Sequence, residues 1–294
     1  MKRTLLFQNP AYIRLKHNQI KVIDPKLNTE LASVPCEDIG FVILEHPQIT
    51  ISLQAIRKLE EHKVAIISCD ETHTPQALML PFSGHVEMQA CLRTQVECSQ
   101  PLKKNLWKQT VEAKIGNQQA VLERLSKPYG QMDDYLVEVQ SGDKTNREGL
   151  AAKFYWKHLW QDFNRDRFGD MPNALLNYGY AILRSAMARA LVGSGLNPSI
   201  GIHHKSKYNA FCLADDIMEP YRPFVDLEVY RIYQETNDIQ ELTVEVKQKL
   251  LSIYTHGLRF ESGEQVLLNG LRTTSSSLVK CLAGKTRKIN YPKL

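Results

Sequence analysis

The chain changes its hydrophobic periodicity near residue 90. In residues 13–16 and 19–23, apolar and polar side chains alternate on either side of a His-Asn pair, a pattern that predicts a β-hairpin with one buried face. Beyond residue 90, apolar residues recur at helical spacing and runs of β-branched residues are few. We therefore expect an α+β protein with a small β-rich domain carrying one helix, residues 1–90, and a larger all-helical domain, residues 91–294.

The first domain also carries a strand, helix, strand pattern. Residues 41–44 and 64–67 are short apolar runs that predict buried strands, and Ser52 can cap a helix over residues 53–59. This order predicts a crossover between parallel strands.

Two segments of the second domain show the clearest helical patterns. One predicted helix runs from Asn173 to Gly193 or Gly195, and another begins after Thr145 and continues through residues 151–156.

Composition excludes several classes of protein. A hydrophobic fraction of 43% and a charged fraction of 23% are typical of a folded protein. No apolar run approaches the ~18 residues needed to span a bilayer, and the apolar run of residues 5–7 is too short for a secretion signal. Six cysteines without a Cys-x-x-Cys pair indicate reduced thiols. We expect a cytoplasmic protein.

The excess positive charge lies in the second domain. Residues 1–95 carry ten basic and ten acidic side chains, so the net charge of +5 belongs to residues 96–294. Beyond Glu264 there are six basic side chains and no carboxylate side chain. This basic C-terminal tail is either a solvated segment or a surface that binds phosphates.

Three short segments carry candidate functional groups. Glu148 follows Thr145 at capping-box spacing, so its carboxylate either caps a helix or belongs to a site. His203 and His204 are adjacent, and in an extended loop only one of them would face a given site. Asp216 and Glu219 are three residues apart, which places both on one helical face.

The acidic segment also has a capping interpretation, in which Asp215 or Asp216 is the N-cap and Pro220 lies in the first turn. Two carboxylates and one imidazole from separate segments suit magnesium or manganese. Spacing alone thus indicates a metal-dependent enzyme acting on nucleic acid.

At Glu148, His204 and Glu219 the sequence closely resembles the CRISPR-associated integrase that captures new spacers, the catalytic subunit of the adaptation complex. The resemblance covers nearly the whole chain, with matching segments in the family's order. These segments are Val34-Pro35-x-Glu37-Asp38-Ile39, Cys69-Asp70, His73-x-Pro75, Glu148-Gly149-x-Ala151-Ala152-x-x-Tyr155, Asn177-Tyr178-Gly179-Tyr180-Ala181-Ile182-Leu183, Gly201-Ile202-His203-His204 and Leu213-Ala214-Asp215-Asp216-x-Met218-Glu219-Pro220-x-Arg222-Pro223-x-Val225-Asp226.

The resemblance implies that Glu148, His204 and Glu219 are the catalytic residues and hold Mg²⁺ or Mn²⁺. Asp216 and His203 are the alternative ligands, because many family members have Asp as the third ligand and the histidine is doubled here. The implied reaction is transesterification, in which the 3′-hydroxyl of a short duplex DNA fragment attacks a phosphodiester at the border of a CRISPR repeat.

The resemblance also implies partners. The N-terminal β domain would form a homodimer, and a small ferredoxin-like protein would bridge two dimers. The segment from Ile202 to Phe211 looks most like the type II branch, which works beside an RNA-guided effector nuclease and serves antiviral defence. The DNA backbone would contact Lys205, Lys207 and Arg222 near the site and Lys285, Arg287 and Lys288 in the tail.

Two other functions remain open from the sequence. A metal-dependent nuclease for branched DNA would use the same residues with water as the nucleophile. A DNA-binding scaffold would use the three acidic residues only as helix caps.

Overall fold

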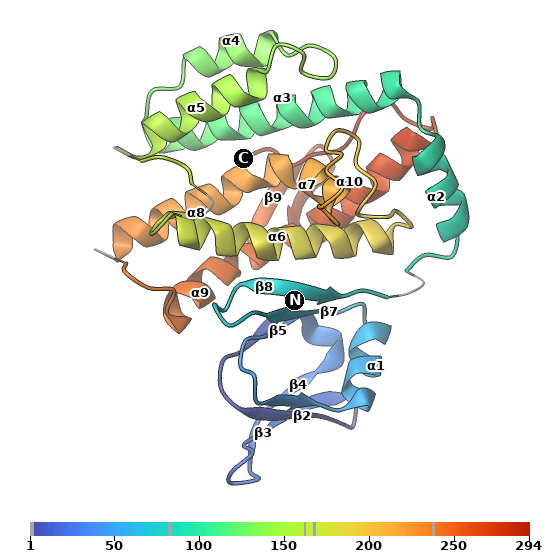
Figure 1. Cartoon of the computed structure of the whole chain (residues 1–294), viewed down its shortest axis with the longest axis vertical. Helices are drawn as coiled ribbons and strands as arrows, with labels where there is room; N and C mark the ends of the chain where they lie inside the picture. Colours follow the sequence, from blue (N-terminus) through green and yellow to red (C-terminus); the bar gives the residue numbers. More distant parts are fainter. Residues whose placement is uncertain (1–2, 82–83, 162, 167–168, 237–238) are drawn as a thin grey trace. The chain divides into compact units, whose positions relative to one another are not determined.

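The computed structural model describes residues 3–81, 84–161, 163–166, 169–236 and 239–294. The chain divides into two compact units, Met1–Gly84 and His85–Leu294 (Figure 1). In the described part of the chain, no helix is both long and apolar enough to cross a membrane.

The described residues of the first unit form two four-stranded sheets and one α-helix, α1 (Leu53–Glu61). The first sheet has the order β1-β5-β7-β8, formed by β1 (Arg3–Phe7), β5 (Ile39–Leu44), β7 (Ala65–Cys69) and β8 (Pro75–Met79). The second has the order β4-β3-β2-β6, formed by β4 (Glu30–Pro35), β3 (Gln19–Ile23), β2 (Ala11–Lys16) and β6 (Ile49–Ile51). A 3₁₀ turn, η1 (Cys36–Asp38), leads into β5.

The predicted hairpin and crossover are both confirmed. Strands β2 and β3 pair antiparallel, and His17 and Asn18 at their turn have positive φ angles, which the tight hairpin turn requires. Strands β5 and β7 pair parallel with α1 between them in the chain. Ser52 caps α1, because its hydroxyl oxygen accepts a hydrogen bond from the Ala55 N–H at 3.3 Å.

The second unit is built on helices, two of which match the predicted ones. These are α5 (Arg147–Leu159) and α6 (Asn173–Gly193). The others are α2 (Met88–Glu97), α3 (Gln100–Arg124), α4 (Gln131–Val137), α7 (Cys212–Met218), α8 (Arg222–Glu235), α9 (Val244–Leu251) and α10 (Leu267–Leu282), with 3₁₀ turns η2 (Glu219–Tyr221) and η3 (Ser252–Thr255).

The expectation of an all-helical second domain is wrong. A two-stranded antiparallel sheet, β9 (Gly257–Phe260) and β10 (Gly263–Val266), precedes α10. Gly263 has a φ of +113°, which a turn can use only at glycine. The ring of Phe260 packs against Gly270 of α10, where a Cβ atom would lie 2.7 Å from the ring. The hairpin therefore depends on a close contact with α10 that its short sequence does not reveal.

The C-terminal segment is only partly a solvated tail. Residues 283–288 are exposed, but Ile289, Tyr291 and Pro292 are buried. The Asn117 amide on α3 donates hydrogen bonds to the carbonyl oxygens of Pro220 at 2.7 Å and Pro292 at 3.1 Å. The last residues of the chain therefore belong to the packed core of this unit.

Candidate active site

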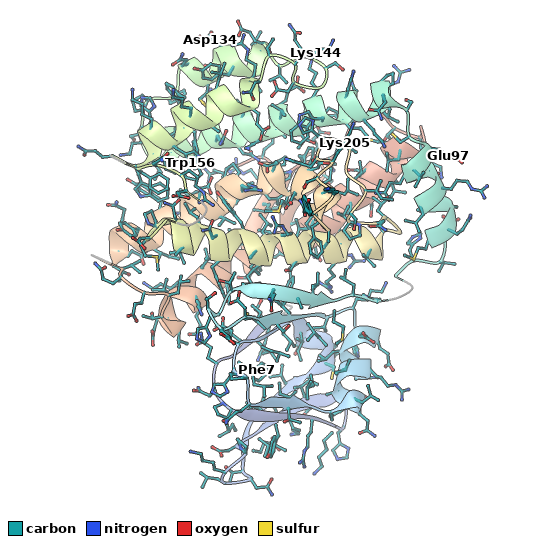
Figure 2. The ribbon with its side chains drawn as sticks, viewed as in Figure 1. Phe7, Glu97, Asp134, Lys144, Trp156 and Lys205 are labelled. Carbon is teal, nitrogen blue, oxygen red and sulfur yellow. The ribbon has the colours of Figure 1, made fainter. Side chains whose placement is uncertain are left out.

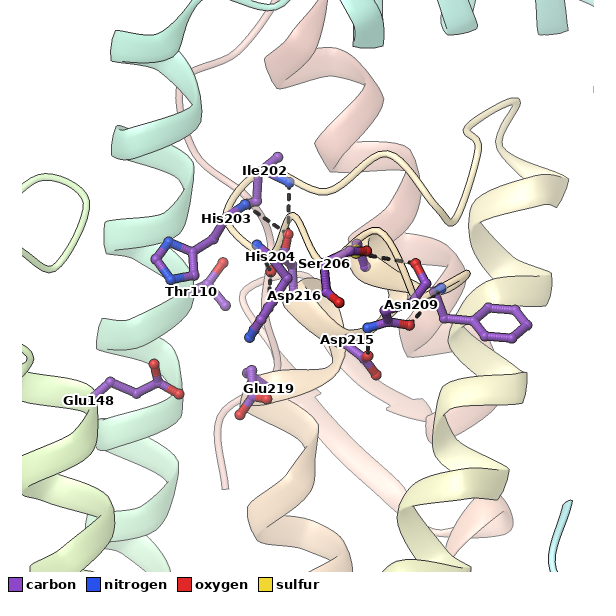
Figure 3. Close-up of polar contacts among 12 residues, drawn as sticks. Thr110, Glu148, Ile202, His203, His204, Ser206, Asn209, Asp215, Asp216 and Glu219 are labelled. Carbon is purple, nitrogen blue, oxygen red and sulfur yellow. Dashed lines mark hydrogen bonds and ion pairs between the residues drawn. The ribbon is translucent and has the colours of Figure 1, made fainter. Parts of the chain in front are cut away.

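Three elements bring the predicted ligands toward α3. Glu148 is the second residue of α5, His204 lies in the segment 194–211 between α6 and α7, and Glu219 opens η2. Figure 3 shows the His204 ring directed toward Glu219, with the Glu148 carboxylate facing the same space. All three side chains therefore face one region of the second unit.

Lys114 of α3 links the two carboxylates. Its Nζ atom lies 2.6 Å from Glu148 Oε1 and 2.6 Å from Glu219 Oε2. Burial alone would lower the pKa of this ammonium, but Glu219 and then Glu148 raise it above its usual value. Lys114 is therefore held as a buried cation between two anions.

Glu219 is almost fully buried and still holds its charge. Burial alone would raise its pKa, but Arg222 and Lys114 lower it below the usual value. Arg222 Nε lies 3.0 Å from Glu219 Oε1. Glu219 Oε2 faces the Lys114 ammonium at 2.6 Å, so both carboxylate oxygens of Glu219 have a basic partner.

Asp216 fixes the loop that carries the histidines. Its Oδ2 atom accepts hydrogen bonds from the backbone N–H groups of Ile202 at 2.7 Å and His203 at 2.9 Å, and its Oδ1 from that of His204 at 3.1 Å. A Cβ atom at Gly201 would lie 2.4 Å from the His204 carbonyl oxygen. Only glycine fits this close turn.

The His204 ring is oriented by the same carboxylate. Its Nδ1 atom lies 2.5 Å from Asp216 Oδ1. This hydrogen bond, more than any other interaction, raises the pKa of His204 above its usual value, against the opposing effect of burial. A neutral His204 with its proton on Nδ1 presents its Nε2 lone pair to the site, as a metal-binding imidazole must.

His203 has a different environment. Its ring stacks on Trp107 with a centroid distance of 4.1 Å and an interplanar angle of 5°. Figure 3 shows this ring pointing away from Glu219. Burial lowers the pKa of His203. Of the two alternative ligands, His203 thus stacks on Trp107, and the Asp216 carboxylate accepts hydrogen bonds from the backbone of the histidine loop.

Both capping interpretations are wrong. The N-cap of α5 is Asn146, whose Oδ1 accepts a hydrogen bond from the Gly149 N–H at 3.3 Å, and the Glu148 carboxylate turns to Lys114 instead. Helix α7 begins at Cys212 after Phe211, so Asp215 and Asp216 lie inside it. Asp215 instead pairs with Arg184, whose Nε is 2.6 Å from Oδ1.

The predicted DNA contacts fall into three groups. Lys205 and Lys207 are exposed on the loop between α6 and α7, and Figure 2 shows the position of Lys205. Arg222 is part of the site, because it pairs with Glu219 and lies 4.7 Å over the Tyr180 ring. In the tail, the cations are exposed, and Lys288 forms an ion pair with Glu261. The tail cations are Lys285, Arg287 and Lys288.

The side chains fit a divalent cation such as Mg²⁺ or Mn²⁺. Two carboxylates and an imidazole are suitable donors for these ions. Over the described ranges, no three His, Cys, Asp or Glu side chains are close enough to form a closed metal-binding group. Lys114 supplies a positive charge between the two carboxylates.

Comparison with known proteins gives one family. The family described as "CRISPR associated protein Cas1" matches residues 4–255. A CRISPR-associated endonuclease Cas1 from Neisseria meningitidis serogroup C (strain 8013) is 35% identical over 261 residues, covering 88% of this chain and 85% of the relative. One from Saccharolobus solfataricus is 27% identical over 239 residues, covering 78% and 75%.

Solved structures share the fold. A casposase bound to its integration product has a TM-score of 0.82 at 22% identity, covering 98% of this chain and 92% of the casposase. A TtCas1–DNA complex has a TM-score of 0.63 at 17% identity, covering 94% of this chain and 91% of that one. A Cas6-RT-Cas1–Cas2 complex has a TM-score of 0.75 at 20% identity and matches 99% of this chain with 36% of that one.

Proposed function

The chain belongs to the CRISPR-associated Cas1 family of endonucleases and integrases, and from this premise we propose that it is a metal-dependent DNA integrase for spacer acquisition. It joins the 3′-hydroxyl ends of short duplex DNA fragments into a CRISPR repeat array by transesterification. The observation that carries this proposal is the convergence of Glu148, His204 and Glu219, from three separate segments, around the buried Lys114.

Glu148, His204 and Glu219 would hold Mg²⁺ or Mn²⁺. The bound ion supplies charge stabilisation at the phosphorus and a lower pKa for the attacking hydroxyl. The chain supplies the positioning: Asp216 holds the His204 ring through Nδ1, and Lys114 and Arg222 keep Glu219 ionised in a buried place. The Glu219 carboxylate is therefore already ionised before DNA binds.

The cations near the site would hold DNA by its backbone. Arg222 lies beside Glu219, and Lys205 and Lys207 are exposed on the histidine loop. Side chains of this kind contact phosphates without reading base sequence. Neutralising Lys285, Arg287 and Lys288 together should lower the salt slope of DNA binding if the tail contacts DNA. An unchanged slope would remove the tail from the interface.

The partners of this protein are part of the same proposal. Solved structures with the same fold include a Cas6-RT-Cas1–Cas2 complex and a TtCas1–DNA complex. We propose a homodimer, bridged to a second dimer by a small ferredoxin-like partner, acting in the cytoplasm. The similarity to the Neisseria meningitidis protein supports the type II branch and its effector nuclease as a further partner.

The two rival functions differ in their support. The scaffold interpretation required Glu148 and the acidic residues of α7 to be helix caps, and Asn146 and Phe211 hold those cap positions instead. A nuclease without integration would use the same geometry with water as nucleophile. The reaction product therefore separates the nuclease from the integrase.

The test is a strand-transfer assay with a short 3′-hydroxyl duplex, a supercoiled plasmid carrying a repeat, and Mg²⁺ or Mn²⁺. We expect wild type to join the fragment and Glu148→Gln, His204→Asn and Glu219→Gln each to lose about 100-fold or more in rate. Glu112→Gln is the control, because Glu112 lies on α3 and pairs with Lys108. Cleavage without joining, even with the bridging partner added, would favour the nuclease.

A direct measurement of metal binding separates the ligands from other catalytic groups. Titration of Mn²⁺ followed by electron paramagnetic resonance should show weaker binding for all three site variants and unchanged binding for Glu112→Gln. Full Mn²⁺ affinity in a site variant would remove that residue from the ligand set.

A further inference from the structure

Helix α10 presents a polar groove that the proposed reaction does not use. The groove has a volume of about 610 Å³, and every side chain lining it is polar or basic. Asn269, Thr273, Ser276 and Lys280 line it from positions spaced four, three and four apart, so they form one stripe along the helix. Together with Arg272, these residues define what we call the α10 groove.

The length of the stripe suits a nucleic-acid backbone. Eleven residues separate Asn269 from Lys280, which corresponds to about 16 Å along the helix axis. This distance spans about five nucleotides of one strand of B-form DNA. The hydroxyl groups of Thr273, Ser276 and Ser277 lie between the two cations, Arg272 and Lys280, and hydroxyl groups donate hydrogen bonds to phosphate oxygens.

Arg272 and Lys280 are the two cations of the groove. In the described part of the chain, neither Arg272 nor Lys280 forms an ion pair, whereas Lys114, Arg222 and Lys288 all do. None of the described side chains that line the groove is a carboxylate. Both cations are exposed, so they are accessible to a ligand with negative charge.

Arg272 also repels a second cation, Arg189. Arg189 of α6 is largely buried, and burial together with the nearby Arg272 lowers its pKa to about 10. A phosphate beside Arg272 would offset that repulsion. The groove therefore has the hydrogen-bond donors and the uncompensated positive charge of an anion site.

The other side of α10 is tied to the candidate active site. Thr274, one residue after Thr273, is buried and its hydroxyl lies 2.6 Å from the Tyr221 hydroxyl in η2. At the end of the groove, the Asn290 N–H donates a hydrogen bond to the Ser277 hydroxyl at 2.9 Å. The groove thus lies on a helix packed against the turn that carries Glu219.

We propose that the α10 groove binds the phosphodiester backbone of a DNA duplex at a position distinct from the phosphate that reacts. The identity of the ligand rests on the proposed function, because that function makes duplex DNA the substrate. The groove holds the duplex without reading its sequence.

The test measures binding of a fluorescent duplex as salt is raised from about 50 to 300 mM without divalent metal. Arg272→Gln combined with Lys280→Gln should reduce the slope of log K against log salt by about 1.8, and affinity at about 0.1 M salt by about tenfold. Lys16→Gln combined with Lys26→Gln is the control, since these exposed cations of the first unit change the net charge equally. An unchanged slope in the groove variant, or an equal loss in the control, would overturn the proposal.

A single substitution provides a second test. Ser276→Glu places a carboxylate between the two cations at an exposed position, so folding should be retained and duplex binding should weaken. Ser276→Ala is its control and should bind within about twofold of wild type, because it adds no charge. Equal binding by both variants would contradict the proposal.

Strand transfer, measured over a range of DNA concentrations, keeps the two proposals apart. The groove variants should need about tenfold more DNA to reach half of their maximal joining rate, because the α10 groove binds the duplex but does not touch the reacting phosphate. If wild type binds duplex DNA and joins nothing, the integrase proposal fails and the salt-slope test of the groove still applies. If wild type joins ends and the groove variant keeps the wild-type slope of log K against log salt, only the proposal for the α10 groove fails. A wild type that binds no duplex would overturn both.

Discussion

The candidate active site and the α10 groove differ in whether their cations are paired with carboxylates. At the site, Lys114 and Arg222 are enclosed by carboxylates at 2.6 to 3.0 Å. In the groove, Arg272 and Lys280 are exposed and, in the described residues, without an ion-pair partner. The site therefore pairs its charges within the chain, while the groove leaves its charges accessible to a ligand.

Burial explains the difference. An ion taken out of water is costly unless a partner and hydrogen bonds compensate it, and removing one partner of such a pair leaves the other charge uncompensated. Exposed cations remain hydrated and carry no such penalty. The comparison predicts large stability effects at the site and binding effects without stability loss in the groove.

The largest expected effect comes from breaking the buried cluster at Lys114. Lys114→Met leaves Glu148 and the buried Glu219 without their shared cation, and the free energy of unfolding should fall by about 3 kcal/mol. Denaturant unfolding in EDTA measures this loss. Mn²⁺ should restore stability more in Lys114→Met than in wild type, because the ion replaces the lost charge.

Lys108→Met is the matched control on the same helix. Lys108 forms an exposed ion pair with Glu112 at 3.5 Å, and its removal should cost about 0.5 kcal/mol or less. Similar losses in the two variants would mean that burial does not distinguish the site from the surface.

A smaller effect is expected at Asp216. Asp216→Asn removes the charged acceptor of His204 Nδ1, so the pKa of His204 should fall toward its ordinary value of 6.5. In wild type, the pKa of His204 is raised, so as the pH falls the ring is protonated at a higher pH in the folded chain than in the unfolded chain. The ion pair between the protonated ring and Asp216 therefore stabilises the fold fully below pH 6.5. That stability is lost as the pH rises through the raised value.

The measurement is an NMR titration of the His204 ring in EDTA, paired with the pH profile of strand transfer. Because a protonated ring cannot bind metal, the acid limb of the activity profile should move to lower pH in Asp216→Asn. Asp215→Asn is the comparison variant, since Asp215 pairs with Arg184 and makes only a distant contribution to His204. An unmoved His204 titration in Asp216→Asn would show that the hydrogen bond does not set its pKa.

The sequence predicted the local elements better than the contacts between them. The hairpin at His17 and Asn18 and the helix after Ser52 follow from patterns within a few residues, and both are present. The β9–β10 hairpin was missed because its strands have four residues each and depend on the packing of Phe260 against Gly270.

The site shows the same limit. Glu148, His204 and Glu219 were selected by their segments and by a family resemblance, whereas Lys114 was not selected. It lies 34 residues before Glu148 on a helix with many polar side chains. Only the folded chain brings its ammonium group between the two carboxylates. The available signal in the sequence was a lysine at position 114 between the apolar residues Val111 and Ile115, which indicates a basic side chain beside a buried helix face.

The smallest expected effect is at Lys288. Its ion pair with Glu261 is exposed on both sides, so Lys288→Gln should leave the melting temperature unchanged. Differential scanning calorimetry checks this against Lys114→Met. A loss comparable with Lys114→Met would place the exposed part of the tail among the structural elements.

The Asn117 side chain has a consequence for how the protein matures. Its amide group joins Pro220, directly after Glu219, to Pro292. During synthesis, the turn that carries Glu219 lacks this support until residue 292 has left the ribosome. The turn that carries Glu219 and the segment around Pro292 are therefore completed together, although about 70 residues lie between them in the chain.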